Sequence, residues 1–180
     1  MVTISNDNDV VTLINVFSVA PEHQAALMIE LSGPSVGPGQ FVNGLKLSGA
    51  NASNSVIRGL VINGFSSDGI RASSGASCRV EGNFIGTDPS GTVDEGNHTG
   101  VDIGGNSTIG GTSPAERNLI SGNDFSGVTL TERGNKIEGN LIGTNINGTK
   151  TPNRWATVTV CSLTPSRTTQ SGIPIPATVH

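Results

Sequence analysis

The feature that most constrains this chain is an internal repeat. Residues 81–88 (EGNFIGTD) return almost unchanged as residues 138–145 (EGNLIGTN), about 57 positions later. The likeness continues downstream, because the stretch 100–103 has a counterpart with the same apolar alternation at 157–160. A chain that repeats itself over this length is typically built from stacked copies of one small structural unit.

A shorter repeat indicates what that unit is. A glycine followed by an apolar and polar alternation recurs roughly every 25 to 30 residues, at residues 44–47, 69–70, 100–103 and 127–130. Further short apolar segments between Gly, Asn, Ser, Thr and Asp predict strands at residues 55–57, 60–62, 78–80, 84–85, 108–109, 119–120, 136–137 and 141–142. Strands this short are not stable as hairpins. Stacked about 4.8 Å apart, each can pair with its equivalents above and below.

The sequence therefore predicts an all-β fold, a right-handed parallel β-helix (solenoid) whose handedness follows the usual chirality of parallel crossovers. The 25 glycines and the low aromatic content of 3% suit tight corners around a narrow core. Asparagine tolerates such corners and can bond its counterpart one coil away, so we expect Asn83, Asn118, Asn123 and Asn140 at equivalent bends. The alternative is a sandwich with glycine-rich turns.

The predicted β-helix spans residues 32–160 and is flanked by two different segments. Residues 10–19 alternate like a strand, and Pro21–Leu31 has the pattern of an amphipathic helix with proline in its first turn. Residues 1–31 thus form either a cap for the first coil or the remnant of another domain. Residues 161–180 are rich in Pro, Ser and Thr and predict an irregular or disordered tail. A final strand at Val158 and Val160 has an edge that needs covering.

Two family resemblances rest on these residues. The strings 82–88, 100–103, 108–112 and 116–123 resemble the repeats of bacterial right-handed parallel β-helices of the pectate-lyase-like superfamily, over about residues 36–160. This resemblance implies the fold, and it covers polysaccharide lyases, glycoside hydrolases and surface proteins without assigned chemistry. Residues 9–31 resemble the start of antibiotic-biosynthesis-monooxygenase-like ferredoxin-fold domains.

Charge and the chain ends bear on partners and compartment. The net charge of −4 argues against nucleic acid or an acidic membrane surface as partner, and no apolar run is long enough for a membrane span. Met1–Asp9 lacks the basic flank and apolar centre of a signal peptide. The resemblance implies an extracellular or cell-surface location. The short opening and abrupt end predict a fragment of a larger bacterial protein.

The resemblance to polysaccharide lyases implies a carboxylate cluster that binds calcium, and an Arg or Lys as base. The candidate calcium ligands are Asp88, Asp94, Glu95 and Asp102. The candidate catalytic carboxylates are Asp88, Asp94 and Asp102, and the possible bases are Arg71, Arg79 and Arg117. A solvated acidic loop explains the same residues. Apart from calcium, no cofactor is predicted.

Two further observations weaken the case for an enzyme. Residues 67–70 (SDGI) resemble one motif of the polygalacturonase-like group, but the additional aspartates and glycine-flanked histidine of that group are absent, which favours a turn at Asp68. Tyrosine is absent and Trp155 is the only tryptophan, so the usual aromatic platform for sugar rings is missing.

The sequence thus predicts a β-helix scaffold that binds polysaccharide or partner proteins without catalysis. The first alternative is a polysaccharide lyase or glycoside hydrolase with the acidic loop as its centre. The second is a monooxygenase-like module derived from the opening segment.

Overall fold

The structure, a computed structural model, describes residues 2–4, 12–13, 29–35, 37–149 and 158–160. These residues form short β-strands and two 3₁₀ helices, η1 (Ala50–Ala52) and η2 (Pro114–Glu116). Within these ranges, no helix has the length and apolar character that a membrane crossing requires.

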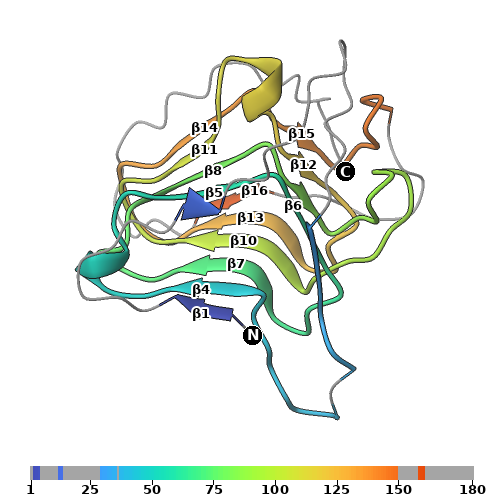
Figure 1. Cartoon of the computed structure of the whole chain (residues 1–180), viewed down its shortest axis with the longest axis horizontal. Coiled ribbons are helices and arrows are strands. Elements are labelled where there is room, and N and C mark those ends of the chain that lie inside the picture. Colours follow the sequence, from blue (N-terminus) through green and yellow to red (C-terminus); the bar gives the residue numbers. More distant parts are fainter. Residues whose placement is uncertain (1, 5–11, 14–28, 36, 150–157, 161–180) are drawn as a thin grey trace, which may run out of the picture.

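The strands form three parallel sheets, and each sheet takes every third strand of the chain (Figure 1). Sheet A contains β1 (Val2–Ile4), β4 (Leu45–Leu47), β7 (Asp68–Ala72), β10 (Thr99–Ile103), β13 (Ser126–Leu130) and β16 (Val158–Val160). Sheet B contains β2 (Thr12–Leu13), β5 (Ser55–Arg58), β8 (Cys78–Glu81), β11 (Thr108–Gly110) and β14 (Lys136–Glu138). Sheet C contains β3 (Ile29–Ser32), β6 (Leu60–Asn63), β9 (Phe84–Ile85), β12 (Leu119–Ile120) and β15 (Leu141–Ile142).

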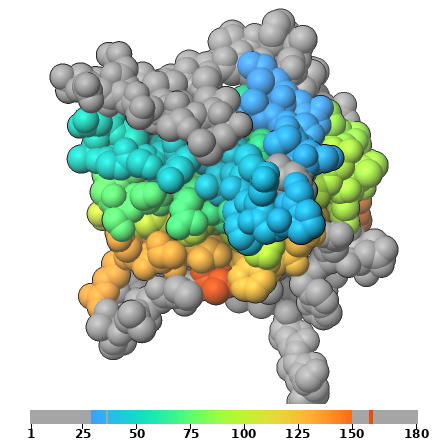
Figure 2. Space-filling model, turned by 90° about the horizontal axis from the view of Figure 1, so that it is seen from below, coloured from blue at the N-terminus to red at the C-terminus, as the bar shows by residue number. Residues whose placement is uncertain are grey.

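Three successive strands, one from each sheet, form what we call a triplet. Each strand pairs with the equivalent strand of the neighbouring triplet, as when Phe84 pairs with Leu119 and Leu119 with Leu141. Figure 2 shows the consequence, because the colours follow one another as bands in sequence order. All named strand pairs in the described ranges are parallel. This confirms the all-β class with parallel strands and excludes the antiparallel sandwich.

The strands predicted between residues 44 and 142 are confirmed. Each predicted segment falls within a strand, and the glycine-led segments become β4, β7, β10 and β13 of sheet A. The long repeat of the sequence spans two triplets, since the corresponding residues Phe84 and Leu141 both pair with Leu119.

One hydrophobic core joins the three sheets. Alternate residues of the strands point into it, as Leu45, Ile70, Val101 and Val128 do in consecutive strands of sheet A, and all four are fully buried. Sheets B and C contribute side chains such as Val80 and Ile85 to the same cluster. Burial of such side chains stabilises each by roughly 1.5–3 kcal/mol.

Asparagine side chains connect the triplets at the corner between sheets B and C. Asn118 Oδ1 accepts hydrogen bonds from the backbone N–H and the side-chain Nδ2 of Asn83, both at 3.0 Å. Asn140 Oδ1 accepts the equivalent pair from Asn118, at 3.2 and 2.8 Å. The preceding glycines, Gly82 and Gly139, have φ of 64° and 68°, a left-handed conformation that glycine adopts without steric cost. The prediction for Asn83, Asn118 and Asn140 is confirmed.

The other two corners use the same device. Between sheets C and A, Asn123 Oδ1 accepts the backbone N–H and Nδ2 of Asn97, at 3.1 and 3.0 Å. Between sheets A and B, Asn135 Oδ1 accepts the backbone N–H of Ser107 at 2.9 Å. Asn123 is therefore at a bend, as predicted, but at a different corner from Asn83.

The opening segment differs in part from the sequence prediction. The end of the expected helix Pro21–Leu31 is wrong, because Ile29–Ser32 form β3, in register with Leu60–Asn63 of β6. The sequence IELS also alternates with period two, and the edge of β6 supplies backbone partners that an isolated helix end lacks. The expected strand at 10–19 is confirmed at Thr12–Leu13, which pair with β5.

With β1 on β4, the sheets therefore begin upstream of residue 32, where we expected the β-helix to start. The rest of the expected strand and helix, and the predicted tail 161–180, lie outside the described residues.

A substitution of Asn118 tests the asparagine connection. Asn118→Ala leaves the buried Val80 carbonyl and the Asn83 N–H without their partners. We expect the free energy of unfolding to fall by roughly 2–4 kcal/mol, measured by urea denaturation. Asn147→Ala, at an exposed loop position, is the control and should change it by less than about 0.5 kcal/mol. Equal stability of the two variants would contradict this account.

Candidate functional site on the outer face of sheet A

The acidic residues predicted as a calcium or catalytic centre occupy separate places. Asp88, Asp94 and Glu95 lie in the loop between β9 and β10, whereas Asp102 lies on β10 itself. In the described part of the chain, no three His, Cys, Asp or Glu side chains form a group that could hold a metal ion. The structure thus gives no support to a calcium centre made from these four residues.

Asp88 organises its own loop. Its Oδ1 accepts hydrogen bonds from the backbone N–H groups of Thr92 and Val93, at 3.1 and 3.0 Å, and from Ser90 Oγ at 2.9 Å. Burial acts to raise the pKa of Asp88, but these hydrogen bonds favour the carboxylate and hold the pKa below its ordinary value. The side chain has a structural role that requires no ligand.

The other two loop residues also have structural contacts. Exposed Asp94 forms an isolated antiparallel bridge with Thr87. Glu95 Oε2 accepts a hydrogen bond from Asn63 Nδ2 at 2.9 Å, and Glu30 Oε1 accepts from the same nitrogen at 2.7 Å. The Glu95 contact ties the loop to Asn63 at the end of β6, and the Asp94 bridge lies within the loop.

The outer face of sheet A carries a continuous row of polar side chains. The register aligns equivalent positions in successive strands, and we call this row the sheet A strip: Lys46, Arg71, Asp102, Thr129 and Thr159. Each member alternates with inward-facing residues, so the strip side chains are half-buried or exposed. Neighbouring members lie about 4.8 Å apart along the stack.

Arg71 is the centre of the strip. Its Nη1 lies 2.9 Å from Asp68 Oδ2 and 3.2 Å from Asp102 Oδ2. The Asp68 side chain is only 7% exposed and that of Asp102 18%, whereas that of Arg71 is 45% exposed. Two nearly buried carboxylates therefore share one accessible guanidinium group.

The strip perturbs the protonation of its members. Burial, and then the negative charge of Asp68, raise the pKa of Asp102, although Arg71 acts to lower it. The hydrogen bond to Asp68 raises the pKa of Arg71 against the effect of burial, so the guanidinium holds its proton firmly. A carboxyl group that stays protonated to higher pH is a feature of catalytic acids, and also of buried structural carboxyls.

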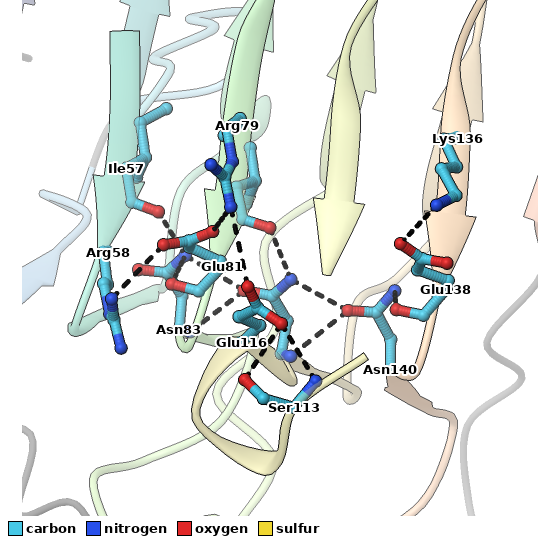
Figure 3. A network of polar contacts seen from close by, with 12 residues as sticks. Ile57, Arg58, Arg79, Glu81, Asn83, Ser113, Glu116, Lys136, Glu138 and Asn140 are labelled. Carbon is cyan, nitrogen blue, oxygen red and sulfur yellow. Dashed lines mark hydrogen bonds and ion pairs between the residues drawn. The ribbon is translucent and has the colours of Figure 1, made fainter. Parts of the chain in front are cut away.

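On sheet B, charged residues of β5 and β8 form a network with Glu116 of η2, and Lys136 pairs separately with Glu138 (Figure 3). Arg79 lies 2.6 Å from Glu81 and 3.6 Å from Glu116, and Arg58 lies 3.4 Å from Glu81. Glu116 also accepts from the backbone and hydroxyl of Ser113, which caps η2. Of the predicted bases, Arg79 thus belongs to this network, and Arg117 Nε donates to the Gly139 carbonyl at 2.8 Å.

Sequence reasoning considered Arg71 and Asp102 separately and missed that they meet, together with Asp68, on sheet A. The signal was present, because Arg71 and Asp102 each stand two residues after the recurring glycine, Gly69 or Gly100. Aligning the glycines places these two side chains side by side in sheet A. Asp68, predicted as a turn before a strand, is instead the first residue of β7.

Comparison with known proteins adds no assignment. No family model matches the chain, and no curated protein or solved structure is significantly similar to it.

The two perturbed carboxyls provide a test of the strip. In carbon-detected NMR titrations we expect Asp102 to titrate above the ordinary value of 3.8 and Asp88 below it. Because its pKa is raised on folding, Asp102 contributes stability that is present below pH 3.8 and lost as the pH rises through its folded pKa. Asp102→Asn should therefore stabilise the protein slightly at pH 7, by less than about 1 kcal/mol, and this difference should vanish at acidic pH.

The control is Asp94→Asn, in the exposed loop, which should leave the titration of Asp102 unchanged. A pKa of Asp102 below 3.8 would contradict the described environment.

Proposed function

We propose that the chain winds as a right-handed parallel β-helix, one coil per triplet. Three parallel sheets around one core, each taking every third strand, support this winding. The strong preference of parallel crossovers for the right hand supports the handedness.

On this β-helix, we propose that the sheet A strip binds an extended polysaccharide and that the chain acts as a non-catalytic scaffold. The observation that carries the proposal is the register that aligns Lys46, Arg71, Asp102 and two threonines on one face. Carboxylate, guanidinium, ammonium and hydroxyl groups together donate and accept hydrogen bonds. A regular row of such groups matches the repeated hydroxyls of a polysaccharide chain.

The chemistry of the strip favours a polysaccharide over a protein partner. Protein interfaces have an apolar, aromatic-rich centre that is depleted in charge. The centre of the strip is instead Arg71 with Asp68 and Asp102, flanked by Lys46 and Thr129.

The first test compares two matched arginines. Arg71 and Arg79 are both about half exposed, and each contacts two carboxylates, but they lie on sheets A and B. We expect Arg71→Ala to weaken binding of soluble xylan, hydroxyethyl-cellulose or polygalacturonate by about tenfold or more, because a charge-assisted hydrogen bond is lost. Arg79→Ala should bind like the unmodified protein. Affinity electrophoresis and calorimetry measure both.

Circular dichroism of both variants verifies that the fold persists. Equal loss of binding in the two variants, or undetectable binding of every polysaccharide by the unmodified protein, would reject the sheet A strip as the binding surface.

A second candidate function is glycoside hydrolysis, and one observation favours it. Asp68 and Asp102 contact the same nitrogen, so their oxygens lie closer than the roughly 6.5–9.5 Å of inverting glycosidases and fit the closer pair of retaining ones. In this reading Asp102, with its raised pKa, protonates the leaving oxygen and Asp68 is the nucleophile. Lyase chemistry is less well supported, because the raised pKa of Arg71 makes it a poor base.

The hydrolase candidate predicts a specific loss of activity. If the protein releases reducing ends from these polysaccharides, Asp102→Asn should lower the rate by roughly 10²–10⁴-fold, with calcium present or absent. Asp94→Asn is the matched control and should keep full activity. Undetectable release by the unmodified protein, with binding retained, would leave the scaffold function alone.

A further inference from the structure

Two stacked aromatic rings stand at one border of the sheet A strip. The ring centroids of His98 and Phe125 are 5.3 Å apart and their planes differ by 11°. Backbone hydrogen bonds fix the pair, because Phe125 N donates to His98 O at 2.8 Å and His98 N donates to Phe65 O at 2.9 Å. The stack therefore joins equivalent loops of successive triplets, as the strand pairs do within the sheets.

The position of the stack places it beside polar groups of sheet A. His98 immediately precedes Thr99, the first residue of β10, and Phe125 immediately precedes Ser126, the first residue of β13. Ser126 Oγ lies 3.4 Å from Thr159 Oγ1 of the strip. The stack is also one residue away from Thr99, the register partner of Asp68, whose carboxylate contacts Arg71 of the strip.

Both residues of the stack are exposed to solvent. Phe125 is 65% exposed, whereas Phe65, in the loop that joins sheets C and A two triplets earlier, is 5% exposed. A lone exposed aromatic residue needs no explanation. An exposed ring that is held by a stack and borders a polar row has the composition of a sugar-binding subsite, in which an aromatic face packs on the C–H face of a pyranose.

We propose that His98 and Phe125 form a stacking subsite for a pyranose ring of a neutral β-linked polysaccharide bound along the sheet A strip. This inference rests on the proposed function and names its ligand class. Neutral chains are favoured because the charges of Lys46 and Arg71 are balanced by those of Asp68 and Asp102, which leaves no positive excess to attract uronates. The subsite supplies the aromatic platform that the absence of Tyr and the single Trp had seemed to exclude.

The test uses cellohexaose as the neutral probe and hexagalacturonate as the acidic one, with calorimetry on the full chain. Phe125→Ala should weaken cellohexaose binding by roughly two- to tenfold, and Phe125→Leu, which keeps apolar bulk without an aromatic face, should weaken it nearly as much. The matched control is Phe41→Ala, which removes an exposed phenylalanine, 78% exposed, from outside the stack. It should bind like the unmodified protein. Cellohexaose should also shift the NMR signals of the Phe125 ring.

Separate outcomes distinguish the subsite from the strip. Full affinity of Phe125→Leu, an equal loss in Phe41→Ala, or tighter binding of hexagalacturonate than of cellohexaose would each overturn the subsite. If Arg71→Ala still weakens glycan binding in that case, the strip stands without the subsite. If neither the probes nor the polysaccharides bind, both proposals fall.

Discussion

The whole structure depends on how backbone polar groups are satisfied where the chain turns from one sheet to the next. Within the sheets the parallel ladders satisfy them, but at a corner the N–H groups would be buried without partners, at a cost of about 1–3 kcal/mol each. Asparagine solves this locally. The Nδ2 groups of three asparagines each donate to a sheet B carbonyl of the preceding triplet: Asn83 to Ile57, Asn118 to Val80 and Asn140 to Ile109. The backbone N–H of Asn83 donates to Asn118 Oδ1, and that of Asn118 donates to Asn140 Oδ1. Within the described residues, the series ends at Asn140. Each asparagine corner therefore depends on the triplets above and below it.

This arrangement separates the residues that hold the fold from those that are available for binding. Inward positions carry Leu, Ile and Val, and corners carry Asn, Gly and Ser. On sheets A and B, most outward positions carry charged or hydroxyl groups. On sheet B the outward charges pair among themselves around the nearly buried Glu81. On sheet A the polar row of Lys46, Arg71, Asp102 and two threonines continues from strand to strand, and for this reason we place the binding surface there.

The strands could be predicted well from the sequence because each one is marked by a local pattern that recurs along the chain. A glycine before Leu45, Ile70, Val101 or Val128 marks the start of an inward alternation, and each became a strand of sheet A. Local patterns failed where pairing decided the outcome, as at Ile29–Ser32, whose alternation also suited a helix until the edge of β6 fixed it as a strand. The candidate site was predicted only in part. Asp102 and Arg71 were both identified, but their contact depends on register between residues 31 positions apart, and Asp68 was assigned to a turn.

The contact between Asn97 and Asn123 at the corner between sheets C and A allows successive triplets to differ in length without losing alignment. Ile85 pairs with Ile120, and Asn97 is hydrogen-bonded to Asn123. Between these two links, residues 86–96 form the long loop that holds Asp88, whereas the equivalent segment of the next triplet is only residues 121–122. The hydrogen bonds of Asn97 to Asn123 align the end of the long loop with the next triplet before β10 begins. Insertions at this corner therefore lengthen a surface loop while the neighbouring sheets stay unchanged.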